Sequence, residues 1–177
     1  MQKAIAWVDV EFSGTSPEVD SFLEIAVALT DFDGNLLKDP YSSLVIVKDL
    51  HRVLDEAQEL VKLMHEKSGL WNDLWTQQAK KPEEIDQDLS ELLREVGETS
   101  IIYFGGNSPF RDRRYAELYL PRFYERISHM SVDVTTLSLV LQEKGAARMF
   151  IKRGEHRALP DVLDSIDEYR HYLHWVE

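Results

Sequence analysis

The sequence lacks cysteine altogether, so disulfide bonds and thiolate metal sites are excluded. This absence fits a reducing compartment. The N-terminus also lacks an apolar run that could serve as a signal peptide or cross a membrane. Its apolar stretch has about the length of one β-strand and is interrupted by Asp9. We therefore expect a cytoplasmic protein that does not associate with a membrane.

Positive charge is scarce: 20 lysines and arginines stand against 32 aspartates and glutamates, which gives a net charge of −12. That balance disfavours a protein that coats long nucleic acids through general charge attraction. It leaves open a nucleic-acid enzyme, since metal ions can neutralise clustered carboxylates. Residues 144–157 form a local basic segment, with five basic residues and one acid, that could hold a short substrate. A solvated loop explains the same segment equally well.

The length and composition favour one globular domain spanning residues 1–177. Hydrophobic residues make up 44% of the chain and charged residues 29%, which is ordinary for a soluble domain. A chain of this length can bury a sizeable apolar core. No internal repeat, low-complexity tract or linker divides the sequence.

The first third of the chain predicts three β-strands joined by short turns. Residues 4–12 are apolar, β-branched and aromatic, and residues 22–32 have the same character. Asp33-Gly34 is a hairpin signal ahead of a third strand at about 43–47. Three consecutive strands with short connections indicate an antiparallel meander.

The remainder of the chain alternates helices with strands. The predicted helices span 51–65, 70–78, 82–97, a stretch that begins at Pro109, 135–142 and 160–173, and the predicted strands span 100–104 and 131–134. Thr135 is the expected N-cap of its helix. A meander followed by alternating helices and strands is an α/β domain. We expect a mixed five-stranded sheet, antiparallel and then parallel, flanked by helices.

The first strand places two carboxylates side by side. Residues two apart in a strand point to the same face, so Asp9 and Glu11 continue the face that carries Ile5 and Trp7. Burying two unpaired like charges costs on the order of several kcal/mol. Either the strand emerges into solvent after Val8, or a bound cation compensates the two charges.

Three further polar groups stand next to the ends of predicted elements. Asp112 falls early in the helix after the fourth strand, His156 lies in a loop, and Asp161 begins the last helix. Ligands of open α/β sheets bind outside the carboxyl ends of strands, where Asp9 and Glu11 also lie. Four carboxylates balance two divalent cations such as Mg²⁺ or Mn²⁺, which prefer oxygen ligands. An imidazole can take a proton from an attacking water.

Five motifs follow one another along the chain. They are D-V-E-F-S-G (9–14), H-E-K-S-G-L (65–70), G-N-S-P-F-R-D-R-R (106–114), V-D-V-T-T-L (132–137) and H-R-A-L-P-D (156–161). Together the motifs resemble those of oligoribonuclease, a family of DEDDh 3′→5′ exonucleases with the ribonuclease H-like fold. The resemblance covers most of the chain and agrees with the predicted strands and helices. It favours the bound cation over the solvated strand.

The resemblance implies an active site with two Mg²⁺ or Mn²⁺ ions. Asp9 would bridge the two ions, and Glu11 and Asp161 would complete one site. Asp112 would hold the second ion, partly through water. His156 would be the general base that activates water against the 3′-terminal phosphodiester, and the products would be nucleoside 5′-monophosphates.

The resemblance also implies the substrate and the partner. The substrate would be short single-stranded RNA, with DNA as an alternative, and two copies of the chain would form a homodimer. Gly14 and Thr15, which follow the first strand, are candidate substrate contacts. So are Asn107 and Ser108, which follow the fourth strand. For the second pair a purely structural role in the turn is equally open.

The chain departs from the family pattern where the substrate would be held. Family members carry leucine at the position of Thr15, tryptophan at Leu60 and a Tyr-Arg pair at His129-Met130. These family residues grip the terminal bases and cap the 5′ phosphate of a dinucleotide. Pro160 also replaces an aspartate of the family. We therefore expect an exonuclease that is less strictly selective for dinucleotides.

Two other functions are weighed against this one. A DNA-directed, proofreading-type exonuclease would use the same five residues, because contacts to the 2′-OH distinguish RNA from DNA and the sequence does not locate them. An inactive relative that binds nucleic acid or a partner protein would have lost at least one metal ligand. The sequence retains all of them.

Overall fold

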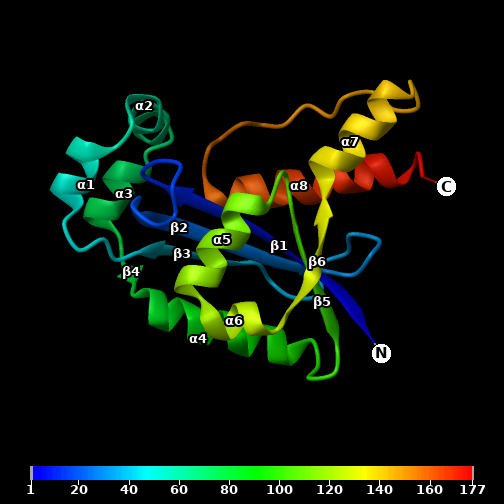
Figure 1. Cartoon of the computed structure of the whole chain (residues 1–177), viewed down its shortest axis with the longest axis horizontal. Coiled ribbons are helices and arrows are strands. Elements are labelled where there is room, and N and C mark those ends of the chain that lie inside the picture. The colour runs from blue at the N-terminus through cyan, green and yellow to red at the C-terminus, as the bar shows by residue number, and fades with distance from the viewer. Residues whose placement is uncertain (1, 177) are drawn as a thin grey trace.

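Within residues 2–176, which the computed structural model describes, six strands form one mixed sheet (Figure 1). The strands are β1 (Lys3–Phe12), β2 (Phe22–Thr30), β3 (Tyr41–Val45), β4 (Ala79–Lys80), β5 (Ile101–Gly106) and β6 (Ile127–Asp133). Their spatial order is β4-β3-β2-β1-β5-β6. β1, β2 and β3 pair antiparallel, whereas β5 and β6 continue from β1 in parallel. The predicted meander followed by parallel strands is confirmed.

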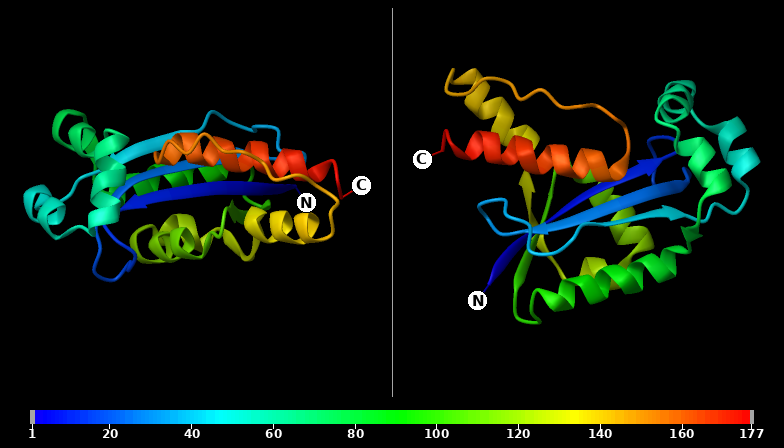
Figure 2. Two further views of the ribbon diagram at one scale, coloured as in Figure 1. Left: turned by 90° about the horizontal axis from the view of Figure 1, so that it is seen from above. Right: turned by 180° about the vertical axis from the view of Figure 1, so that it is seen from behind.

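Helices cover both faces of this sheet (Figure 2). The helices are α1 (Leu50–Glu56), α2 (Glu59–Lys67), α3 (Leu70–Thr76), α4 (Pro82–Glu95), α5 (Phe110–Tyr119), α6 (Pro121–Glu125), α7 (Val134–Glu143) and α8 (Ala158–Leu173). α4, α5 and α6 pack on one face, and α7 and α8 pack on the other. α1, α2 and α3 gather at one end of the sheet (Figure 1). None of the helices in the described residues has the length and apolar character needed to span a bilayer.

The two faces of β1 contribute to two separate hydrophobic cores. Val8 and its even-numbered neighbours pack with side chains of α4 and α5 such as Leu89. Ile5 and Trp7 pack with side chains of α8 such as Ile166. Strand alternation then directs the next odd-numbered side chains, including the two β1 acids, toward α8. The predicted face assignment of β1 is confirmed, and it determines where the acids meet the rest of the site.

The sheet has six strands rather than the predicted five. The additional strand, β4, is two residues long and pairs in parallel with the end of β3. A segment this short contains no alternating pattern, so sequence periodicity does not reveal it. β6 also begins at Ile127, ahead of the strand predicted at 131–134.

Two helix predictions need correction. The stretch 51–65 is not one helix, because Ala57 and Gln58 adopt extended backbone angles (ψ of 143° and 136°) between α1 and α2. The apolar spacing continues across this break and hides it. Thr135 is not the N-cap of α7: its backbone N–H donates to Oδ1 of Asp133 at 3.0 Å, and Asp133 is the cap.

Candidate active site

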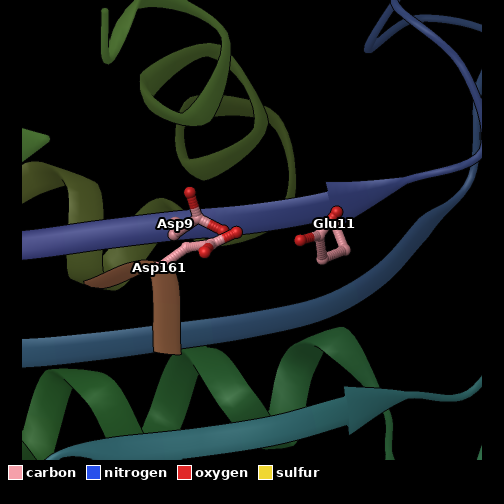
Figure 3. Close-up of side chains that lie close together, drawn as sticks. All are labelled: Asp9, Glu11 and Asp161. Atoms are coloured by element: carbon pink, nitrogen blue, oxygen red, sulfur yellow. The ribbon is translucent and has the colours of Figure 1, made fainter. Parts of the chain in front are cut away.

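Three carboxylates from two elements converge at the carboxyl end of β1. One oxygen each of Asp9, Glu11 and Asp161 lie within 4.8 Å of one another. Figure 3 shows the two β1 side chains next to Asp161, which comes from the first turn of α8. The three acids meet because strand alternation turns both β1 residues toward the layer that contains α8. The predicted convergence of these three acids is present in the structure.

Asp112 approaches the same hollow from α5. β1 pairs with β5 only as far as Trp7 and Gly105, and the chain then turns into α5. Beyond that point the backbone N–H of Val10 donates to Oδ1 of Asp112 at 3.0 Å. The hollow at this end of β1 measures about 570 Å³. Its lining includes all five residues expected to carry chemistry, namely Asp9, Glu11, Asp112, His156 and Asp161.

The acidic cluster carries uncompensated negative charge. Burial raises the pKa of Asp9 well above its ordinary value, and the charges of Asp112 and Glu11 raise it further. Burial, followed by the charge of Asp161, raises the pKa of Glu11 to about 8. Burial also raises the pKa of Asp112 to about 6, although a backbone hydrogen bond opposes the shift. Among the described residues, no lysine or arginine nitrogen lies within 4 Å of these four carboxylates.

These residues fit a divalent metal ion. Their oxygen donors are of the kind that Mg²⁺ and Mn²⁺ prefer. A bound cation would remove the mutual repulsion that helps to raise the pKa values of the cluster. Glu11 is only 7% exposed, so β1 does not emerge into solvent at this end. The solvated-strand explanation of the two β1 acids is therefore wrong.

His156 lies at the rim of the hollow, exposed to solvent, in the loop before α8. Its backbone φ is 54°, which is uncommon for a residue other than glycine. Anchored arginines stand on both sides of it. Arg153 donates to Asp164 from its backbone N–H (2.8 Å) and from Nε (2.6 Å), and Arg157 donates to Glu24 at 2.9 Å. The imidazole is thus carried on a backbone that is fixed at both ends.

The basic segment 144–157 is connected to the fold by ion pairs, so it is more than a solvated loop. Lys152 pairs with Glu168 at 3.2 Å. Arg157 reaches Asp73 of α3 at 2.7 Å in addition to its partner on β2. Three of the five basic side chains therefore form ion pairs within the fold. Their positive charge holds the loop against α8, β2 and α3.

Asn107 and Ser108 occupy the turn between β5 and α5 and line the hollow. The Asn107 amide donates to Glu168 at 2.7 Å and accepts from the hydroxyl of Ser165 at 2.6 Å. Ser108 has a φ of 49°, and its backbone N–H donates to Asp133 at 3.0 Å. The Asn107 side chain thus connects β5 to α8. The exposed Ser108 stays a candidate for substrate contact.

Gly14 and Thr15 lie in the turn after β1 and are not among the residues that line the hollow. A side chain at Gly14 would collide with the carboxylate of Asp20, which accounts for the glycine. Thr15 is exposed, and its hydroxyl accepts a hydrogen bond from Gln58 at 3.3 Å. A role for this pair in holding substrate stays a prediction.

Two residues at the site were missed by sequence reasoning. His65 is fully buried, with Nε2 3.0 Å from the carbonyl oxygen of Phe12 and 3.8 Å from Oε2 of Glu11. Burial lowers its pKa, although the hydrogen bond to the carbonyl opposes this shift. Its place in the H-E-K-S-G-L motif was the available signal. Phe110 lines the hollow and is 81% exposed, and no sequence pattern marked it.

Comparisons with known proteins agree with this geometry. The family model described as Exonuclease matches residues 6–169. An oligoribonuclease of Neisseria meningitidis serogroup C is 32% identical over 174 residues, covering 95% of this chain and 89% of the relative. An oligoribonuclease of Leifsonia xyli subsp. xyli is 33% identical over 172 residues, covering 95% of this chain and 81% of the relative.

Solved structures show the same fold at lower sequence identity. An E. coli ExoI–ssDNA complex with bound zinc has a TM-score of 0.72 and 14% identity, and the match covers 97% of this chain. This chain spans only 40% of that exonuclease I chain. The structural likeness therefore supports the ribonuclease H-like fold alone, while the family match and the curated relatives carry the classification. The chain belongs to the exonuclease family and is related to the oligoribonucleases, as its motifs predicted.

Proposed function

We propose that this protein is a metal-dependent 3′→5′ exonuclease that hydrolyses short single-stranded oligoribonucleotides to nucleoside 5′-monophosphates. The observation that carries the proposal is the meeting of Asp9, Glu11 and Asp161, with oxygens within 4.8 Å, in a chain of the exonuclease family. The names of the curated relatives favour RNA over DNA as the substrate.

The proposed metal ligands are Asp9, Glu11 and Asp161 for one ion, with Asp9 and Asp112 for a second. Bound Mg²⁺ or Mn²⁺ would stabilise the attacking and leaving oxygens of a phosphodiester displacement. Without such ions the four carboxylates would repel the negatively charged substrate. The chain's own contribution is to hold these acids in a water-accessible hollow bounded by Ser108 and His156.

His156 is proposed as the general base. It stands at the solvent-exposed rim of the hollow, where an attacking water can reach its ring. The ion pair of Arg157 with Glu24 holds the adjacent backbone to β2. In this proposal the ring accepts the proton of the attacking water and passes it to solvent.

Relaxed length selectivity is also proposed. Leu60 is 79% exposed and Met130 is 50% exposed, so neither side chain is part of the wall of a closed pocket. A second hollow of about 690 Å³ begins at His156 and is lined by residues that include Met64 and Lys67. The two hollows share His156, so the surface around the catalytic hollow is open rather than closed around a dinucleotide. The single domain, the homodimer and the cytoplasmic location stay predictions.

A degradation assay with RNA and DNA oligomers labelled at the 3′ or the 5′ end tests this proposal. With Mg²⁺ or Mn²⁺, 5′-labelled RNA should give a descending ladder and 3′-labelled RNA should give labelled mononucleotide at once. A chelator of divalent cations should stop the degradation of both labelled RNAs. Glu98→Gln, which changes an exposed acid in the loop before β5, at the end of the sheet away from the site, is the matched control and should retain activity. Mononucleotide release that persists in the chelator would contradict the metal-dependent mechanism.

A further inference from the structure

Phe110 is the most exposed aromatic side chain in the described part of the chain. It is 81% exposed, whereas Trp175 is 50% and Trp75 is 47% exposed. Leaving a phenyl ring in water forgoes the stabilisation that burial would give. Single exposed apolar residues are common, so exposure alone would not indicate a role. Phe110, however, lines the catalytic hollow beside Asp112.

The backbone that carries Phe110 is rigid. Pro109 precedes it with φ fixed at −72°, and the Phe110 N–H donates to the carbonyl oxygen of Ser108 at 2.8 Å. Gly106 packs closely here, because a side chain at this position would lie 3.2 Å from Cβ of Pro109. The ring therefore projects from a fixed first turn of α5. A rigid aromatic ring loses little conformational entropy when a ligand stacks on it.

Phe110 and His156 reach the carboxylates from different layers of the fold. α5 packs on the face of the sheet that contains Val8, and His156 precedes α8 on the opposite face. A phosphodiester displacement is in line, so the leaving oxygen lies opposite the attacking water. If His156 activates the water, the leaving 3′-oxygen lies on the side of Phe110. That oxygen belongs to the penultimate nucleotide of the substrate.

We propose that Phe110 is a substrate-binding residue on which the base of the penultimate nucleotide stacks. This inference rests on the proposed exonuclease function and adds a nucleotide position to it. Base–aromatic stacking is tolerant of sequence, since every base has a π-face. Phe12, the other phenylalanine that lines the hollow, stacks on Tyr115 with ring centroids 4.9 Å apart and is already engaged. Phe110 provides the free ring face.

Steady-state kinetics on an RNA pentamer test the inference. Phe110→Ala should raise KM about ten-fold, within the range that stacking of one base gives, and change kcat less than three-fold. Phe110→Trp should keep the KM of the unchanged protein. Leu139→Ala, which truncates an apolar side chain of α7 that is 60% exposed, is the matched control and should change neither constant.

A pentamer that lacks only the penultimate base separates stacking from an indirect effect. On this substrate the unchanged enzyme should have the same raised KM that Phe110→Ala has on the intact pentamer. Phe110→Ala should not raise the KM for this substrate any further. An equal effect of Phe110→Ala on both pentamers, or none on the intact one, would overturn the inference. Mononucleotide release by the unchanged enzyme would in either case leave the proposed exonuclease function standing.

Fluorescence supplies a readout without turnover. A pentamer with 2-aminopurine at the penultimate position and a hydrolysis-resistant last linkage should be quenched on binding, because stacking quenches this base. Quenching should disappear in Phe110→Ala and persist in Phe110→Trp. Quenching that is unchanged in Phe110→Ala would place the base elsewhere and overturn the assignment.

Discussion

Two acidic clusters lie side by side at one end of the central strands β1 and β2, and they differ in how their charge is balanced. Glu11 of β1 and Glu24 of β2 are register partners, so the clusters are adjacent. The carboxylate of Glu24 accepts from Arg157 at 2.9 Å and from the backbone N–H of Ala158 at 3.0 Å. Arg157 also binds Asp73 at 2.7 Å. The Glu24 cluster thus contains its own cation.

The cluster around Asp9 has no such partner among the described residues. Its three carboxylates come within 4.8 Å of one another, and burial raises the pKa of each of them. The cation at Glu24 belongs to the fold, whereas the acids around Asp9 are neutralised by bound protons or by a cation from outside the chain. The comparison distinguishes a buried charge network that stabilises the fold from one that is available for chemistry. Variants that change one cluster at a time test this distinction.

The largest effect is expected from Asp9→Asn. If Asp9 is the shared ligand as proposed, losing its carboxylate should lower mononucleotide release by about 10³-fold or more, because the two proposed metal ions would no longer be held together. In chelator the same variant should melt at a higher temperature than the unchanged protein, since one repelling charge is removed. Thermal unfolding and a labelled-RNA assay measure the two effects. A variant that keeps one tenth of the activity would contradict the metal-ligand assignment.

Arg157→Met should lower the stability of the protein, whereas Asp9→Asn should raise it in chelator. It leaves Glu24 and Asp73 partly buried without a cation, so we expect a loss of about 3 kcal/mol in the free energy of unfolding. Urea unfolding measures this loss, and Glu24→Gln in the same chain should recover part of it. The kcat should also fall, because His156 is the next residue and because the charge of Arg157 lowers the pKa of Glu11. A loss below about 1 kcal/mol would show that this network is not structural.

The pH dependence of stability should also separate the two clusters. The pKa of Glu11 is about 8 in the folded chain, compared with an ordinary value of 4.5. Between these values the folded protein holds a proton that the unfolded chain has released. Stability of the metal-free protein should therefore fall as the pH rises from about 4.5 to about 8. Melting curves in chelator should show this decline, and Glu11→Gln should flatten it.

Metal addition should reverse that decline. Bound Mg²⁺ or Mn²⁺ requires deprotonated ligands, so it should raise the melting temperature more at pH 8 than at pH 6. Glu98→Gln, an exposed acid in the loop before β5, serves as the control and should leave both slopes unchanged. A metal-free protein that becomes more stable between pH 5 and pH 8, to the same extent with and without Glu11→Gln, would contradict the buried, uncompensated cluster.

The sequence predicted the positions of the four acids correctly but did not predict the ion pairs beside them, and the difference has a physical reason. Strand alternation in β1 and the early helical positions of Asp112 and Asp161 are local patterns, and they place carboxylates on known faces and ends. The ion pairs of Arg157 depend on β2 and α3, which are 133 and 84 residues away along the chain. The hydrophobic periodicity of the sequence does not show which distant residues will form ion pairs. The basic segment therefore looked equally like a loop or a substrate surface.

The missed elements have a similar origin. The break at Ala57 and Gln58 does not interrupt the apolar spacing, so α1 and α2 read as one helix. β4 exists because it pairs with β3, since its two residues alone have no strand pattern. Phe110 was overlooked because its exposure, not its type or spacing, distinguishes it. Exposure becomes visible only when the tertiary structure is known.

The smallest effect concerns substrate length. Rates on RNA dimers and on 5- to 10-mers should differ by less than about five-fold, because Leu60 lies exposed on α2 and forms no pocket wall. Leu60→Trp should shift the ratio a few-fold toward the dimer by adding a stacking surface. Leu63→Trp, on the same helix and 54% exposed, is the control and should not shift it. A strong dimer preference in the unchanged protein would show that Thr15 and Leu60 hold a terminal base as well as the family's leucine and tryptophan do.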